Sequence, residues 1–274
     1  MSERLAGKVA IVTGSGIREG DGVGVGRAMA TLFAREGARV LVVDREMANA
    51  EKTLAALEEE GLSASAFEAD VSVEAECEAM VAAAVDRYGK LDVLGNAVGI
   101  GYRGKVTEMV EADWDRVLDV DLKSCAMASK HAIPAMVDSG GGGSIINISS
   151  IDGIKAGMTP NIPYAAAKGG MIAMTRSMAV HHGRDGVRVN AIAPGHIYTT
   201  MVSGVLSEEQ RERRKNAGPL GTEGTAWDVA WAGVFLASDE ARWITGVVLP
   251  VDAGTLVANP LSMYDQIREG EGGD

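Results

Sequence analysis

Short apolar runs rich in β-branched residues alternate along the chain with longer stretches that place apolar residues at helical spacing. The short runs predict strands at residues 9–12, 40–43, 64–69, 91–94, 144–148, 187–192 and 247–251. The longer stretches predict helices at residues 24–36, 47–60, 74–88, 111–136, 163–181 and 226–237. Strands that are apolar throughout are typical of a sheet buried on both faces. The pattern therefore predicts an α/β fold, a doubly wound parallel sheet in three α/β/α layers.

This alternation continues without a linker, so a single domain over residues 1–274 is expected. The glycine run at residues 140–143 is interpreted as a turn, because the strand after it belongs to the same pattern. Residues 199–218 are expected to form a lid over a pocket, and residues 257–274 a C-terminal tail. The apolar residues of the lid segment weakly favour a partly apolar ligand.

Charge and composition exclude several classes of protein. The formal net charge is -12, which disfavours binding to nucleic acid or to an anionic membrane. The two cysteines, Cys77 and Cys125, fall within predicted helices, so no structural disulfide is expected. No cysteine pair or H-E-x-x-H motif accompanies the four histidines, so no metal site is predicted. Neither a secretory signal nor a membrane-spanning apolar run is visible, and a cytoplasmic protein is the default expectation.

Tyr164 and Lys168 are the leading candidates for chemistry. They lie four residues apart in a predicted helix and therefore share a face. A free phenol has a pKa of about 10, and a neighbouring ammonium group favours the phenolate and lowers that pKa. Ser150, after the fifth predicted strand, can hold an alcohol or carbonyl oxygen. The three residues predict proton transfer to and from an alcohol, although the spacing alone also fits an ordinary amphipathic pair.

Glycines gather between the first predicted strand and its helix, where a doubly wound sheet binds its ligand. Glycine lets the backbone approach a pyrophosphate, and the helix N-terminus offers free N–H groups to it. Gly24 and Gly26 are chosen because the helix starts directly after them. Asp44, at the end of the second strand, would accept the ribose hydroxyls and repel a 2′-phosphate, which favours NAD over NADP. A helix N-cap role for Asp44 is compatible with the same position.

Taken in order, these motifs resemble the short-chain dehydrogenase/reductase family, in its single-domain branch, from residue 7 to about residue 256. The matching segments are Thr13-Gly14…Gly24-Val25-Gly26, Asp70-Val71, Asn96-Ala97-Val98-Gly99, Ile148-Ser149-Ser150, Tyr164-Ala165-Ala166-Ala167-Lys168 and Pro194-Gly195-His196-Ile197-Tyr198-Thr199. The resemblance implies a Rossmann-type sheet. It also adds cofactor-binding residues, namely Gly14, Asp70, Val71, Asn96, Gly99, Tyr164, Lys168, Pro194, Gly195, Ile197 and Thr199. Asp70 would meet the adenine ring, and Ile197 and Thr199 the nicotinamide carboxamide.

The chain departs from the family pattern at two places. Nine residues separate Gly14 from Gly24, whereas the family motif T-G-x-x-x-G places three residues between its two glycines. The insert, residues 15–21, is interpreted as a surface bulge, with a flap beside the cofactor as the alternative. Asp121 replaces the family's catalytic asparagine, whose main chain holds a water in a relay to the lysine. A carboxylate there would change the proton balance near Lys168.

The resemblance implies a function and a set of catalytic residues. It implies an NAD(P)-dependent short-chain alcohol dehydrogenase/ketone reductase, with NAD preferred, that interconverts a secondary alcohol and a ketone by hydride transfer. The catalytic residues would be Ser150, Tyr164, Lys168 and Asp121, with Ser150 preferred to Ser149 because it fits S-x-x-G. The alternative is a non-catalytic dinucleotide-sensing binding protein of the same fold.

Two further expectations concern partners. The family implies a homo-oligomer, expected to be a tetramer, that acts on a small molecule. The basic residues at 211–215 follow acidic ones at helical spacing and are interpreted as a salt-bridged exposed face, with binding of an anionic substrate as the alternative.

Overall fold

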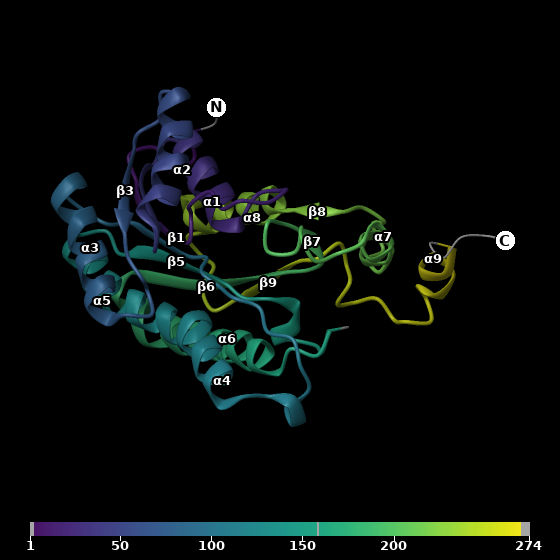
Figure 1. Cartoon of the computed structure of the whole chain (residues 1–274). Coiled ribbons are helices and arrows are strands. Elements are labelled where there is room, and N and C mark those ends of the chain that lie inside the picture. The colour runs from purple at the N-terminus through teal and green to yellow at the C-terminus, as the bar shows by residue number, and fades with distance from the viewer. Residues whose placement is uncertain (1–2, 158, 270–274) are drawn as a thin grey trace.

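Seven parallel strands form the central sheet of the computed structural model, which describes residues 3–157 and 159–269 (Figure 1). Their order across the sheet is β3-β2-β1-β4-β5-β6-β9. The strands are β1 (Val9–Thr13), β2 (Arg39–Asp44), β3 (Ala64–Glu68), β4 (Val93–Asn96), β5 (Gly143–Ile148), β6 (Val187–Pro194) and β9 (Val248–Val251). Two short strands, β7 (Ile197–Tyr198) and β8 (Gly224–Thr225), pair separately and also in parallel. The predicted parallel sheet is therefore confirmed.

Helices cover both faces of this sheet, which gives the predicted three layers (Figure 1). They are α1 (Val25–Arg35), α2 (Met47–Glu59), α3 (Glu74–Tyr88), α4 (Glu111–Leu118), α5 (Ser124–Asp138), α6 (Ile162–His182), α7 (Glu208–Asn216), α8 (Ala226–Ala237) and α9 (Tyr264–Glu269). On one face Phe33 of α1 and Val234 of α8 belong to one buried cluster. On the other face Met80 of α3 and Met136 of α5 belong to a second cluster. Full burial of such side chains contributes about 1.5–3 kcal/mol each, so both layers stabilise the sheet.

The long helix predicted at residues 111–136 is present but is not regular. A π-helical turn, Asp119–Lys123, joins α4 to α5. Such single-turn π segments often accompany functional sites. Here the π turn contains Asp121, whose side chain is fully buried.

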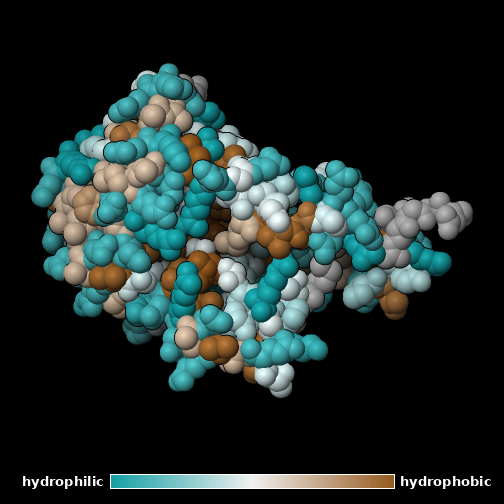
Figure 2. Space-filling model, in the orientation of Figure 1, coloured by the Kyte–Doolittle hydropathy of each residue, from teal (hydrophilic) through white to brown (hydrophobic). Residues whose placement is uncertain are grey.

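The direction of the strand order reverses between β1 and β4, because β2 and β3 follow on one side of β1 and the later strands on the other. The carboxyl ends of β1 and β4 therefore define the switch point at which ligands of such sheets bind. The molecule is hollowed between the part that carries α1 and α8 and the part that carries α4 and α6 (Figure 2). The loops after β1, β4, β5 and β6 are consequently the segments that can line a site.

Several boundaries differ from the predictions. The fourth strand is displaced from residues 91–94 to Val93–Asn96. The predicted lid segment contains α7, and the tail contains α9, which contacts α7. The end of the predicted tail, residues 270–274, lies outside the described residues. No helix in the described part of the chain is long and apolar enough to cross a membrane.

Candidate active site

Ser150, Tyr164 and Lys168 meet at the carboxyl edge of the sheet. Ser150 follows β5 with an extended backbone, and its Oγ accepts a hydrogen bond of 3.1 Å from the amide of Asp152. Tyr164 lies in the first turn of α6, and hydrogen bonding from Ser150 lowers the pKa of its phenol. Lys168 lies one turn later, with Nζ 5.5 Å from the centroid of the Tyr164 ring. The helical spacing therefore places the Tyr164 phenol near the Lys168 ammonium group, and the end of β5 brings the Ser150 hydroxyl to Tyr164.

The two neighbouring serines have different surroundings. Ser149 Oγ donates to the carbonyl oxygen of Lys168 at 2.9 Å and is buried. This bond attaches the end of β5 to α6. Ser150 is the serine that interacts with Tyr164, which agrees with the choice made from the S-x-x-G spacing.

The net pKa shift of Tyr164 differs from the prediction. Burial raises the pKa of Tyr164, and this effect outweighs the charge of Lys168 and the hydrogen bonding from Ser150, which both lower it. Asp121 and Asp152 add to the increase because a nearby negative charge disfavours the phenolate. Lys168 therefore acts in the predicted direction, but its effect is smaller than the cost of desolvating the phenolate.

Asp121 forms a buried ion pair with Lys168. The distance from Asp121 Oδ2 to Lys168 Nζ is 3.3 Å, and the side chains are 0% and 3% exposed. Asp121 Oδ1 accepts a hydrogen bond of 2.8 Å from the amide of Ile100, and Lys168 Nζ donates to the carbonyl oxygen of Ile148 at 3.1 Å. The π turn thus presents a carboxylate to the lysine that adjoins Tyr164.

The two partners of this ion pair have raised pKa values for different reasons. Burial raises the pKa of Asp121, and the positive charge of Lys168 only partly opposes this. Burial lowers the pKa of Lys168, but the charges of Asp121 and Tyr164 outweigh it and raise the pKa above its usual value. Lys168 therefore stays protonated in the neutral pH range.

Gly99 and Asn96 occupy packed positions next to this pair. A Cβ at Gly99 would lie 3.2 Å from Asp121 Oδ2 and 3.3 Å from Lys168 Nζ. Asn96 Nδ2 donates to Asn147 Oδ1 at 2.8 Å, and Asn147 Nδ2 donates to Thr175 Oγ1 at 2.9 Å. This buried amide network ties β4 to β5 and α6, and the sequence interpretation did not include Asn147 or Thr175. Asn147 is a polar residue inside an otherwise apolar run, between Ile146 and Ile148, and this interruption is the signal that could have identified it.

The glycines after β1 fall into two kinds. A Cβ at Gly26 would lie 2.2 Å from the carbonyl oxygen of Gly14, so Gly26 allows α1 to pack against the end of β1. Gly14 has a φ of +63°, a region that favours glycine. Gly24 is the N-cap of α1, it has no side-chain cap, and a Cβ there would meet only Thr200 Oγ1 at 3.7 Å. Gly24 therefore leaves open space beside the uncapped N–H groups of a helix, which fits a pyrophosphate.

Asp44 lies at the end of β2 and is 2% exposed. Its Oδ2 accepts from the amide of Gly16 at 3.2 Å, and its Oδ1 from the amide of Glu46 at 3.3 Å. A Cβ at Gly16 would lie 2.7 Å from Asp44 Oδ2, so this glycine adjoins the carboxylate. Gly16 was not among the selected glycines, although its place two residues after the turn glycine was visible in the sequence.

Asp70 and Val71 follow β3. Asp70 Oδ1 accepts from the amide and the hydroxyl of Ser72, and this hydrogen bonding lowers the pKa of Asp70. Val71 is 5% exposed and belongs to the core cluster of α3 and α5. The main chain at these residues and the carboxylate of Asp70 remain the groups able to contact an adenine ring.

The segment after β6 is held by the insert that follows β1. A Cβ at Gly195 would lie 2.6 Å from Asp252, so the Pro194-Gly195 turn packs against the end of β9. Ile197 lies in β7, and the main chain of Thr199 approaches Gly22. Asp21 Oδ2 accepts a hydrogen bond of 3.1 Å from the hydroxyl of Tyr198. The insert is exposed at residues 18–21, as expected of a surface bulge, and it also contacts Tyr198 and the start of the lid segment.

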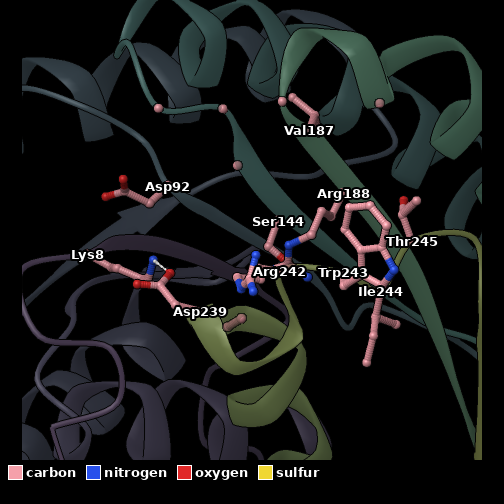
Figure 3. Close-up of a pocket in the computed structure, with 16 residues that line it drawn as sticks. Lys8, Asp92, Ser144, Val187, Arg188, Asp239, Arg242, Trp243, Ile244 and Thr245 are labelled. Carbon is pink, nitrogen blue, oxygen red and sulfur yellow. Dashed lines mark hydrogen bonds and ion pairs between the residues drawn. The ribbon is translucent and has the colours of Figure 1, made fainter.

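Two cavities differ in their relation to this site. The larger, about 510 Å³, lies at the amino ends of the strands, and none of the candidate site residues lines it (Figure 3). Lys8 and Asp239 form an ion pair of 2.8 Å in its wall (Figure 3). The smaller, about 200 Å³, lies at the carboxyl edge and is lined by His196, Ile197 and Arg214 among others. No cluster of metal-ligating side chains occurs within residues 3–157 and 159–269.

This arrangement defines an α/β protein of the Rossmann type, with hydroxyl and ammonium groups at the switch edge of a parallel sheet. The chain belongs to the short-chain dehydrogenase/reductase family, whose members are oxidoreductases that use NAD(P). The family profile described as enoyl-(acyl carrier protein) reductase matches residues 20–255. That match begins within the segment between Gly14 and Gly24, where the chain departs from the family pattern.

Known proteins similar to this chain cover nearly its full length. The 3-oxoacyl-[acyl-carrier-protein] reductase FabG of Thermotoga maritima is 37% identical and covers 93% of this chain and 100% of its own length. Glucose 1-dehydrogenase 2 of Bacillus subtilis is 36% identical, with 93% and 96% covered. A solved structure from Burkholderia xenovorans, described as a short-chain dehydrogenase/reductase, has a TM-score of 0.88 at 41% identity and covers 93% of this chain and 99% of its own. These names span different substrates, so they support an oxidoreductase without specifying what it acts on.

Proposed function

We propose that this chain is an NAD-dependent oxidoreductase that interconverts a secondary alcohol and a ketone. The single observation that carries the proposal is the meeting of Ser150, Tyr164 and Lys168 at the carboxyl edge. Tyr164 takes the hydroxyl proton in alcohol oxidation and returns it in ketone reduction. Ser150 hydrogen-bonds the reacting oxygen. Lys168 stays protonated and favours the phenolate form of Tyr164.

The residues around the β1 turn fit a dinucleotide. The open space at Gly24 and the uncapped start of α1 suit a pyrophosphate, and the buried carboxylate of Asp44 suits ribose hydroxyls in preference to a 2′-phosphate. Gly14 and Gly26 shape the turn. A bound NAD would supply the hydride acceptor for alcohol oxidation, and its reduced form the hydride donor for ketone reduction. The preference for NAD over NADP rests on Asp44.

The remaining cofactor contacts follow from the family resemblance. Asp70 and Val71 would meet the adenine ring, and Ile197 and Thr199 the nicotinamide end. Residues 199–218 would form a lid over the substrate. A homotetramer also belongs to the proposal and is based on the resemblance alone, and a cytoplasmic location belongs to it as the default expectation from the sequence.

The test is the Tyr164→Phe variant, assayed with NAD and a panel of secondary alcohols by the absorbance of the reduced cofactor. General acid–base catalysis accelerates a reaction by roughly 10²–10⁴-fold, so turnover should fall by at least about 10²-fold. Tyr88→Phe is the matched control, because it removes a phenol that hydrogen-bonds Ser65 at 2.7 Å on the β3–α3 side of the sheet. Undiminished turnover in Tyr164→Phe would disprove the mechanism. Tight NAD binding with no turnover of any alcohol by the unmodified chain would favour the non-catalytic sensor instead.

A further inference from the structure

The smaller cavity, of about 200 Å³, lies where the carboxyl ends of β6 and β9 face the lid helix α7. Its polar lining includes one arginine and one histidine, Arg214 and His196, together with the carboxylates of Glu223, Asp228 and Asp252. This volume is below the range of drug-sized ligand pockets, which is about 300–1,000 Å³. A small molecule of a few carbon atoms is therefore the ligand that it suits.

Arg214 differs from the other basic residues of α7. Arg211 is paired with Glu223, Arg213 with Glu209 and Lys215 with Glu212, at N–O distances of 2.6, 2.7 and 3.0 Å. Arg214 is half-buried and has no carboxylate within 4.0 Å among the described residues. Its Nη2 donates to the carbonyl oxygen of Ile197 at 3.1 Å, which directs the guanidinium towards the cavity wall. The salt-bridged face predicted at residues 211–215 is therefore present, but Arg214 is not part of it.

His196 presents a second unsatisfied group. Its Nδ1 is buried and has no hydrogen-bond partner in the described part of the chain. Burial lowers the pKa of His196, and the charge of Arg214 lowers it further, so the ring is neutral at pH 7. The main chain of Arg214 also hydrogen-bonds this ring. A neutral imidazole has a single N–H, so Nδ1 donates to a ligand in the tautomer that carries the proton on Nδ1. A buried, unpaired ring nitrogen is costly to the fold unless a ligand satisfies it.

The carboxylates that line the cavity are already engaged. Glu223 accepts both hydrogen bonds of Arg211, at 3.0 and 2.6 Å. Asp228 accepts from the amide and hydroxyl of Thr225 at the start of α8. Asp252 accepts from two backbone amides, at 2.9 and 2.8 Å. Arg214 is consequently the charged side chain of this lining with no direct ion pair within 4.0 Å among the described residues, although the charges of Glu223 and Asp152 act on it over a longer distance.

Ser150, Tyr164 and Asp152 do not line this cavity, but β5, which Ser150 follows, pairs with β6, which leads to His196. The amide of Asp152 donates to Ser150 Oγ, and the Asp152 carboxylate acts electrostatically on Tyr164, His196 and Arg214 alike. A molecule whose hydroxyl meets Ser150 and Tyr164 can therefore extend towards His196 and Arg214. The lid segment supplies the arginine, so binding of such a molecule would hold the lid closed.

We propose that the substrate is a short hydroxy acid, or the matching keto acid, whose carboxylate binds Arg214 and His196. This inference rests on the proposed function, since it assigns the substrate class of that same site. The planar guanidinium group offers two parallel N–H donors to a carboxylate, and the pair is stronger where water is excluded. Arg214 and His196 are positioned as specificity-determining residues, and neither takes part in proton transfer.

The test compares 3-hydroxybutyrate with its methyl ester, which lacks the negative charge. Steady-state oxidation by the NAD-loaded chain should favour the acid over the ester in kcat/KM by roughly tenfold or more, since a charge-assisted hydrogen bond is worth about 1.5–3 kcal/mol. Arg214→Gln should remove this preference by raising KM for the acid, with little change in kcat or in the kinetics of the ester. Lys215→Gln is the matched control, because it removes a paired cation from the same helix.

Calorimetric titration of both compounds into the chain without NAD gives a second readout that needs no turnover. Tighter binding of the acid, lost in Arg214→Gln and kept in Lys215→Gln, supports the proposal even if the catalytic function fails. Equal binding and equal kcat/KM for acid and ester would overturn it while leaving the oxidoreductase function intact. An equal loss of activity towards both compounds in Arg214→Gln would likewise overturn it, because that result indicates a structural role.

Discussion

The substitution Asp121→Asn gives the sharpest test of the buried ion pair. It restores the residue that the family carries at this position and preserves the size of the side chain. The amide oxygen can still accept the hydrogen bond from Ile100, which is 2.8 Å long in the structure. The change therefore removes the negative charge beside Lys168 with little effect on packing.

The expected loss of stability follows from the geometry. Unit charges 3.3 Å apart attract by about 5 kcal/mol at an effective dielectric constant of about 20. Desolvation of the carboxylate, visible as the raised pKa of Asp121, offsets part of this attraction. Removing one partner of a buried pair typically costs about 3–5 kcal/mol. Because the new amide side chain would retain one hydrogen bond, we expect a decrease of about 3 kcal/mol in the free energy of unfolding.

Urea denaturation at fixed protein concentration measures this decrease as a lower midpoint at an unchanged slope. Asp119→Asn is the control, since Asp119 pairs with Lys123 at 2.7 Å in the same π turn but both side chains are about half exposed. That variant should lose about 0.5 kcal/mol at most. Equal stability of Asp121→Asn and the unmodified chain would refute the argument that this pair stabilises the fold.

The same variant tests the electrostatics of Tyr164. The negative charge of Asp121 raises the pKa of Tyr164, so its removal should lower that pKa. Alcohol oxidation requires the phenolate, and its rate rises with pH as the proton leaves. Over the pH range where Lys168 stays protonated, the acid limb of kcat/KM should move to lower pH in Asp121→Asn. An unmoved limb, or one displaced to higher pH, would contradict this assignment.

Four other substitutions probe the cofactor edge and the contact between the insert and Tyr198. Gly26→Ala places a Cβ 2.2 Å from a main-chain oxygen, so it should lower the free energy of unfolding in urea by about 3 kcal/mol. The Cβ of Gly24→Ala meets nothing closer than 3.7 Å. This variant should therefore fold normally but bind NAD more weakly in calorimetry. Equal stability losses in the two would contradict this division. Asp44→Ser should shift the ratio of kcat/KM for NAD and NADP by roughly tenfold or more towards NADP, and an unchanged ratio would remove Asp44 from nucleotide selection. Tyr198→Phe removes the 3.1 Å hydrogen bond to Asp21, worth about 1 kcal/mol, and should raise KM for the alcohol roughly fivefold. An unchanged KM would show that this bond does not hold the lid.

The sheet could be predicted because strands buried on both faces must be apolar throughout, and the strand–helix alternation then leaves few topologies. The position of β4 could not be read from the same signal. Leu91 is apolar and fully buried, yet it precedes the ladder, whereas Asn96 is polar and lies within it. The buried hydrogen bond from Asn96 to Asn147 makes the polar residue acceptable there. Such a pairing joins residues far apart in sequence and has no local pattern.

The relation of Tyr164 to Lys168 could be predicted because four residues in a helix bring two side chains to one face. Asp121 could be identified as a candidate site residue only through the family resemblance. The π turn that contains it could not be predicted, because no local pattern distinguishes this segment from a regular helix. The net pKa shift of Tyr164 could not be predicted either. Desolvation depends on tertiary packing, and here its effect exceeds that of the nearby ammonium group.

The insert after β1 shows why sequence left two interpretations open. Its glycines and charged residues fit a surface bulge as well as a flap, because loops of either kind are rich in glycine and polar residues. The deciding contacts lie far away in the sequence: Gly20 approaches Ser203, and Asp21 bonds Tyr198. Tyr198 in turn lies under the guanidinium of Arg211, 3.7 Å from the ring centroid. The insert is thereby coupled through Tyr198 to α7, the helix that carries Arg214.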